Sequence, residues 1–137
     1  EWLPRVADPH RHTKLGRGGL ADVEWTVQLL QLQHAAQLPQ LQVQGTLEAL
    51  SAAAAAGVVA AADARVLGDA WRLVSRARNA VVLWTGRPSD SLPKAQRDLD
   101  GVARLVGYPP ASAERFDDDY QRTTRRARAV VERLFYG

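Results

Sequence analysis

The chain has 137 residues and no cysteine, and its 18 Lys and Arg against 15 Asp and Glu give a formal net charge of +3. This length predicts one domain that can bury about two-thirds of its unfolded surface. The lack of cysteine excludes a disulfide scaffold and a thiolate metal site, and no apolar run reaches the ~18 residues needed to cross a bilayer.

The first predicted element follows a glycine-rich segment. Gly16, Gly18 and Gly19 precede a stripe of apolar residues at helical spacing, which begins at Leu20 and ends before Pro39. Glycine adopts positive φ freely, and the first amides of a helix form a natural anion site. The segment therefore predicts either a phosphate-sized binding corner or a tight turn with an N-terminal cap.

Charged residues flank this predicted corner on both sides. Lys14 precedes the glycines, while Asp22 and Glu24 lie in the first helical turn, where carboxylates favour the positive end of the helix dipole. The spacing differs from a Walker A loop, in which the lysine follows the glycines. The corner is thus a candidate binding site without an established phosphate-loop pattern.

The rest of the chain also has helical periodicity. Apolar stripes with Gly or Pro stops predict helices at about 44–56, 61–84, 94–106 and from about 112 to the C-terminal end. Together with the first helix, they predict an all-α fold, an antiparallel bundle of about five helices. We expect residues 14–137 to form this single domain and residues 1–13 to be the end of a preceding helix and a linker.

The third predicted helix carries a second candidate site on its polar face. Arg72, Arg76 and Asn79 recur at i, i+4 and i+7 and so form one ladder. Arginine is suited to bidentate contact with a carboxylate or a phosphate. The alternative is internal pairing with one of three acidic residues, Asp22, Glu24 and Asp69.

Acidic pairs elsewhere have the residue types of a magnesium site, but they lie in predicted helices, where their carboxylates do not converge. Asp98 and Asp100, and the run 117–119, fall in helical patterns. Carboxylates two residues apart on a helix splay by roughly 200° and do not converge on a metal. The pair His10 and His12 has no third ligand at useful spacing. We therefore predict no catalytic residue and no metal site, with the acidic runs on solvated helix faces.

The glycine-rich motif carries a family resemblance. Residues 18–32, GGLADVEWTVQLLQL, resemble a segment of the glutamine synthetase adenylyltransferases, also called adenylyl-removing enzymes. Those proteins have two tandem nucleotidyltransferase units, each followed by a helical domain that opens with Gly-Gly-hydrophobic-x-Asp/Glu-hydrophobic-Glu-aromatic. Residues 125–137 resemble the extreme C-terminus of such a protein. The resemblance, with the absence of methionine, implies the C-terminal helical domain of a larger protein.

The resemblance implies a bifunctional parent enzyme that transfers AMP from ATP to a tyrosine of glutamine synthetase. It further implies Mg²⁺ as a cofactor of the parent and control by a PII-type nitrogen-signalling protein. The lack of cysteine and of an apolar run long enough to span a bilayer predicts a cytoplasmic location. This chain would lie against the upstream nucleotidyltransferase domain of the same polypeptide, helping to close its active-site cleft or presenting the substrate protein. Alone it is expected to be inactive and to bind no cofactor.

Two other functions are compatible with the sequence. One is a pure protein-interaction helical module. The other is a basic nucleic-acid-binding domain, against which the interleaved acidic residues count. In the favoured hypothesis, the corner and the ladder act together at the junction with the catalytic domain, with Arg76 as the partner of the corner. The candidate residues are Lys14, Gly16, Gly18, Gly19, Asp22, Glu24, Arg72, Arg76 and Asn79.

Overall fold

The computed structural model describes residues 11–14 and 16–136. Over this part of the chain the structure is all-α, as predicted, and its single β-bridge joins His12 to Ser91. The predicted preceding helix falls largely in residues 1–10, which lie outside the described residues, as does His10. The elements are α1 (Leu20–His34), the 3-10 turn η1 (Pro39–Leu41), α2 (Thr46–Ala55), α3 (Ala61–Thr85), α4 (Gln96–Val106) and α5 (Ala113–Phe135).

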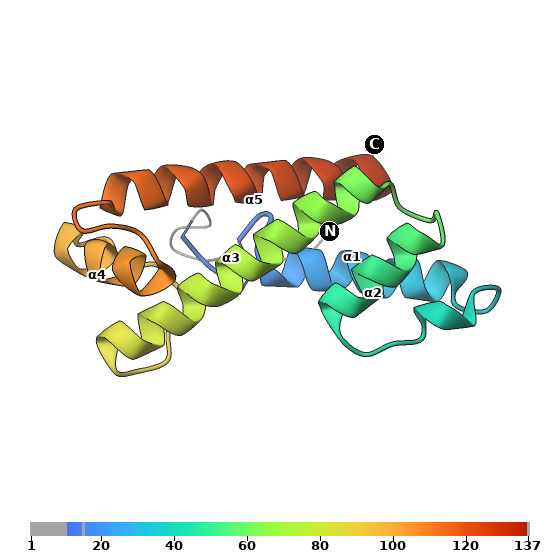
Figure 1. Ribbon diagram of the computed structural model, residues 1–137, viewed down its shortest axis with the longest axis horizontal. Helices are drawn as coiled ribbons and strands as arrows, with labels where there is room; N and C mark the ends of the chain where they lie inside the picture. Colours follow the sequence, from blue (N-terminus) through green and yellow to red (C-terminus); the bar gives the residue numbers. More distant parts are fainter. Residues whose placement is uncertain (1–10, 15, 137) are drawn as a thin grey trace.

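The 25-residue helix α3 organises the bundle. It packs against α1, α2, α4 and α5. In Figure 1, α3 crosses the molecule diagonally, α5 runs along one long edge, and α2 and α4 lie near opposite ends. The direction of α3 is opposite to that of α1 and α5, so the long helices alternate as the short links predict.

The core follows the predicted apolar stripes closely. In α1, the buried side chains recur at helical spacing from Leu20 to Leu30. The predicted stripe of α5 is also buried, apart from the half-buried Leu134 at its end. Removal of apolar area from water contributes about 25 cal/mol per Å² to folding. The buried members of the α5 stripe are Phe116, Tyr120, Thr124, Ala127 and Val131.

Two large apolar residues of the helices, Leu32 and Trp84, are exposed instead. Leu32 is 80% exposed, because it lies about 200° around the helix from the buried Leu30. Trp84 is 43% exposed, although its indole packs against Gly101 of α4, where an added Cβ would come within 2.4 Å of the ring. Its Nε1 donates a hydrogen bond to Asp98, 3.0 Å away.

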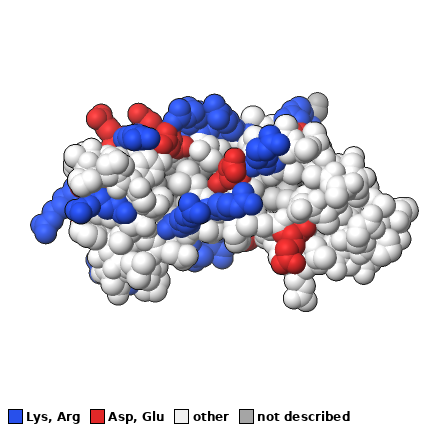
Figure 2. Space-filling view, viewed as in Figure 1, with Lys and Arg blue, Asp and Glu red and all other residues white. Residues whose placement is uncertain are grey.

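The surface mixes both signs of charge. Figure 2 shows basic side chains gathered over α3 and α5, with acidic side chains between them. None of the helices in the described part of the chain has the length and apolar character needed to cross a membrane. The interleaved charges favour a protein surface over a continuous track for a nucleic-acid backbone.

Candidate functional site

The glycine corner, residues 16–24, packs directly on α5. Gly18 has φ +73°, in the left-handed region that favours glycine. A Cβ built on it would lie 1.9 Å from the carbonyl oxygen of Thr124. Gly18 and Gly19 are both buried. The glycines thus allow the backbone of the corner to approach the backbone of α5, because they have no Cβ.

The amides at the start of α1 already have backbone partners. The Leu20 amide donates to the Thr13 carbonyl and the Ala21 amide donates to the Lys14 carbonyl, each over 2.9 Å. The Gly19 amide donates to the Gly16 carbonyl, also over 2.9 Å. The segment before α1 therefore folds back over the helix start and takes up donors that an anion would need.

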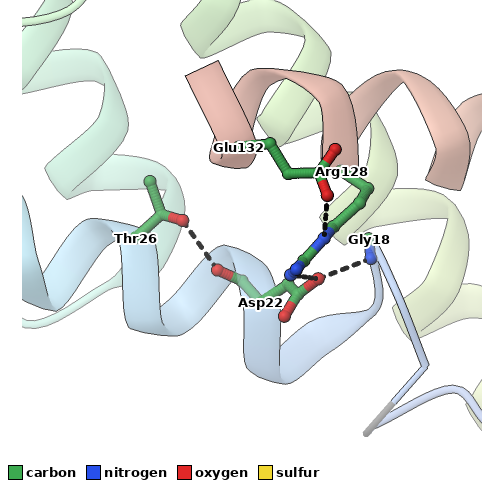
Figure 3. A network of polar contacts seen from close by, with 5 residues as sticks. All are labelled: Gly18, Asp22, Thr26, Arg128 and Glu132. Carbon is green, nitrogen blue, oxygen red and sulfur yellow. Dashed lines mark hydrogen bonds and ion pairs between the residues drawn. The ribbon is translucent and has the colours of Figure 1, made fainter. Parts of the chain in front are cut away.

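The carboxylate of Asp22 links this corner to the far end of the chain (Figure 3). Its Oδ2 accepts hydrogen bonds from the Gly18 amide at 2.7 Å and from Arg128 Nη1 at 3.1 Å. The side chains of Arg128 and Asp22 are only 15% and 19% exposed. Thr26 donates to the Asp22 carbonyl, and Arg128 also donates to Glu132. A partly buried ion pair thus joins α1 to α5.

The guanidinium of Arg128 is held as a cation. Burial acts to lower its pKa, but the nearby carboxylates of Asp22 and Glu132 outweigh that effect, and the pKa is raised. The guanidinium also lies 5.6 Å from the ring centroid of Tyr136, at cation–π distance. Arg128 was missed in the sequence because its partner is 106 residues away, so no local spacing indicates the pair.

Glu24 contacts α3 through a tryptophan and not through the predicted Arg76. The indole Nε1 of Trp71 donates to Glu24 Oε2 over 3.3 Å. Trp71 and Arg76 are five residues apart and so lie about 140° apart around the helix. The helix face that meets α1 therefore carries Trp71, while Arg76 is exposed on another face.

The loop at 86–93, between α3 and α4, holds the chain segment that precedes the corner. The Asp90 carbonyl accepts hydrogen bonds from the Thr13 amide at 2.6 Å and from its hydroxyl at 3.0 Å. The Asp90 carboxylate pairs with Arg78 Nε at 2.7 Å. Leu92 is 2% exposed, and its amide donates to the Arg11 carbonyl. The loop is therefore an internal anchor, although its composition predicts only a polar connection.

The outer face of α3 comprises Arg65, Asp69, Arg72, Arg76 and Asn79, all of which are exposed. Arg72 Nη1 lies 3.5 Å from Asp69 Oδ1, with the two side chains 53% and 61% exposed. Among the described residues, Arg65 and Arg76 have no hydrogen bond or ion pair. This face therefore has cationic groups available for a partner, and Figure 2 shows basic side chains over α3.

The nine candidate residues thus fall into three sets: the corner, one exposed lysine before it, and the outer face of α3. Gly16, Gly18, Gly19, Asp22 and Glu24 belong to a corner closed by α3 and α5. Lys14 precedes that corner and is exposed. The remaining candidates, on the outer face of α3, are Arg72, Arg76 and Asn79.

The acidic runs lie on α4 and α5, as predicted, but several of their side chains have structural partners. Asp100 accepts from the Ser112 amide at 3.0 Å. Asp119 accepts from the Tyr108 hydroxyl at 2.6 Å, and that bond is the largest cause of a lowered pKa at Asp119. Arg122 also donates to Asp119. In the part of the chain that the structure describes, no three His, Cys, Asp or Glu gather as potential metal ligands.

Comparisons with known proteins agree with the resemblance of the glycine-rich motif. Residues 7–135 match the family described as GlnD PII-uridylyltransferase. The chain is 58% identical over 137 residues to a bifunctional glutamine synthetase adenylyltransferase/adenylyl-removing enzyme of Leifsonia xyli, covering 100% of this chain and 14% of that protein. Proteins with the same name from Streptomyces avermitilis and Mycobacterium leprae are 56% identical over 137 residues and 53% over 135, which is 100% and 98% of this chain. The chain spans 14% and 13% of those two relatives.

Proposed function

Because the chain belongs to the GlnD PII-uridylyltransferase family, we propose that it is a helical domain of a bifunctional glutamine synthetase adenylyltransferase and adenylyl-removing enzyme. The whole enzyme transfers AMP from ATP to a tyrosine of glutamine synthetase in the cytoplasm, with Mg²⁺ held by a nucleotidyltransferase domain of the same polypeptide. A PII-type signalling protein controls it. In this proposal, our chain assists that domain and has no catalytic residue of its own.

The observation that carries the proposal is the identity of 53–58% to proteins of that name over nearly all of this chain. The matched family is named for uridylyl transfer, whereas the relatives are named for adenylyl transfer. Both names describe transfer of a nucleotidyl group. The high identity to the relatives favours AMP as the group transferred by the whole enzyme.

The assisting role rests on how the acidic side chains are used. Asp98, Asp100 and Asp119 accept hydrogen bonds from neighbouring helices and loops. These carboxylate oxygens therefore point toward other parts of the same chain. Mg²⁺ near a phosphate is bound through one or two carboxylates whose oxygens are available to coordinate it. We therefore expect the 137-residue chain to give no transfer of AMP to glutamine synthetase when it is supplied with ATP and Mg²⁺, and turnover above a contaminant control would contradict the proposal.

The junction with the catalytic domain is proposed to involve the exposed cations Lys14, Arg72 and Arg76, together with the neutral amide of Asn79. The position of α1 against α3 and α5 is then set by the buried glycines and by the side chains of Asp22 and Glu24. Exposed arginines at a junction reach carboxylates of a partner surface and fix its orientation. Arg76 is the sharpest probe, because it has no partner among the described residues.

The test is an Arg76→Gln substitution in the full-length enzyme, with Arg104→Gln as the matched control. Arg104 is an exposed arginine in the last turn of α4. We expect Arg76→Gln to lower kcat/KM for AMP transfer by about fivefold, the effect of ~1 kcal/mol, with an unchanged melting temperature. A raised KM for glutamine synthetase would indicate substrate presentation, and a lowered kcat would indicate closure of the cleft. Equal activity of both variants and wild type would contradict the junction.

A further inference from the structure

A cleft between α2 and α3 combines an apolar floor with two cationic side chains. Its volume is about 220 Å³, below the roughly 300–1,000 Å³ of pockets for drug-sized ligands. Leu47, Leu50 and the polar Ser51 line it from α2, and Ala64 and Gly68 line it from α3. The small residues on α3 leave the space that a larger side chain would fill. The cleft therefore has room for a small ligand, since a cavity of about 150 Å³ already holds benzene.

The two cations at this cleft are Arg65 and Arg72, both exposed. They are seven residues apart on α3 and so lie on one side of the helix, separated by ~10 Å of helical rise. Arg72 folds over the floor, since its Nη1 lies 3.5 Å from the position of a Cβ built on Gly68. Guanidinium side chains are long enough to converge above the cleft on one bound group.

The net charge of the side chains around the cleft favours a ligand with a single negative charge. Asp69 stands between the two arginines and lies 3.5 Å from Arg72, in a pair whose members are more than half exposed. Such exposed pairs contribute little and exchange partners readily. Arg65, Asp69 and Arg72 together carry a net charge of +1, which a monoanion would neutralise.

We propose that the α2–α3 cleft binds a small monocarboxylate. Its carboxylate group contacts the guanidinium groups of Arg65 and Arg72, and its short apolar body lies against Leu47, Leu50 and the small residues of α3. A carboxylate with an aliphatic body matches both the cationic rim and the apolar floor, whereas inorganic phosphate matches only the rim. The site shares Arg72 with the proposed junction, but its test measures carboxylate binding and not AMP transfer, so its failure and the failure of the proposed function are distinguishable.

The test is isothermal titration of the full-length protein with propionate at constant ionic strength, with inorganic phosphate titrated in parallel. We expect one propionate site with a Kd of about 1 mM, since so small a ligand has a limited binding energy. Arg65→Gln is expected to weaken binding about tenfold by removing a charge-assisted contact. The control Arg104→Gln, far along the chain on α4, should leave the Kd unchanged.

Gly68→Ala separates binding in the cleft from binding at the surface. The added Cβ would lie 3.5 Å from Arg72 Nη1 and 3.6 Å from Leu47 Cδ2, at ordinary contact distance between two lining side chains. Alanine also favours a helix more than glycine does, so the melting temperature should not fall. We expect propionate binding to weaken about tenfold, because the methyl group fills the floor of so small a pocket. The proposal is overturned by binding of phosphate alone, by absence of propionate binding, or by unchanged propionate binding in either Arg65→Gln or Gly68→Ala.

Discussion

The glycine corner and the outer face of α3 use similar residue types in opposite ways. In the corner, the cation and carboxylate are paired within the fold, and Arg128 and Asp22 are at most 19% exposed. On the outer face, the one ion pair joins side chains that are at least 53% exposed. Burial makes the first pair part of the architecture, whereas water screens the second.

The comparison teaches that a conspicuous motif need not be a binding surface. The glycines and the early carboxylates are the most specific pattern in the chain, yet the structure places them between α1, α3 and α5. The ladder on α3 is a much less specific pattern, but its arginines are exposed. A family signature can therefore identify a fold by marking the contacts that fold requires.

The largest effect that we predict is at Gly18. Replacement by alanine combines an unfavourable positive φ with a Cβ only 1.9 Å from the Thr124 carbonyl oxygen. Both the backbone of α5 and the corner would have to shift. We expect the free energy of unfolding to fall by about 3 kcal/mol and the melting temperature by roughly 10 °C, measured by thermal unfolding in circular dichroism.

Gly86→Ala is the control that isolates the effect of backbone conformation. Gly86 has φ +77°, and an added Cβ there would meet nothing within 4 Å. We expect a loss of only about 1 kcal/mol from the strained φ. Equal losses at Gly18 and Gly86 would show that the close approach to α5 contributes nothing.

The second predicted effect is loss of the ion pair between Asp22 and Arg128. Asp22→Asn removes the charge that both Gly18 and Arg128 contact, and it leaves a half-buried guanidinium without its main partner. We expect a loss of about 2 kcal/mol in the free energy of unfolding, measured with urea. In a double-mutant cycle with Arg128→Met, the coupling should be about 1–2 kcal/mol.

Glu132→Gln is the matched control, since Glu132 contacts the same arginine but is 52% exposed. We expect it to cost under about 0.5 kcal/mol. If the Asp22 cycle gives a coupling near zero, the corner is held by packing alone. The contrast in charge pairing between the corner and the outer face of α3 would then disappear.

The sequence predicts the helices well because each carries its own periodicity and stop signals. All five predicted helices begin within two residues of their observed start, and α1 begins at Leu20 as expected. The pairings across the bundle could not be predicted in the same way. Arg128 meets Asp22, and Trp71 meets Glu24 in place of Arg76, because the rotation of one helix against another depends on the packing of the whole core.

A smaller effect is expected where the first turn of α3 is tied to α5. Arg133 donates two hydrogen bonds to Asp63, at 2.8 and 2.9 Å, and this contact lowers the pKa of the Asp63 carboxyl. A carboxyl whose pKa is lowered by folding stabilises the fold above its unfolded pKa of about 3.9, and that contribution is lost as the pH falls through the folded pKa. The melting temperature of wild type should therefore exceed that of Asp63→Asn at pH 6, and the difference should shrink below about pH 4. A difference independent of pH would assign the effect to packing.

The smallest effect that we predict is on the outer face of α3 itself. A double-mutant cycle with Asp69→Asn and Arg72→Gln should give a coupling under about 0.5 kcal/mol, because both side chains are largely in water. That coupling should nearly vanish in 1 M KCl, where the Debye length falls to about 3 Å. The Asp22 and Arg128 coupling should survive, since burial limits screening. If the exposed pair of Asp69 and Arg72 instead couples as strongly as the buried pair, Arg72 stabilises the fold and is not available to a partner. The proposed difference between the corner and the outer face of α3 would then be wrong for Arg72.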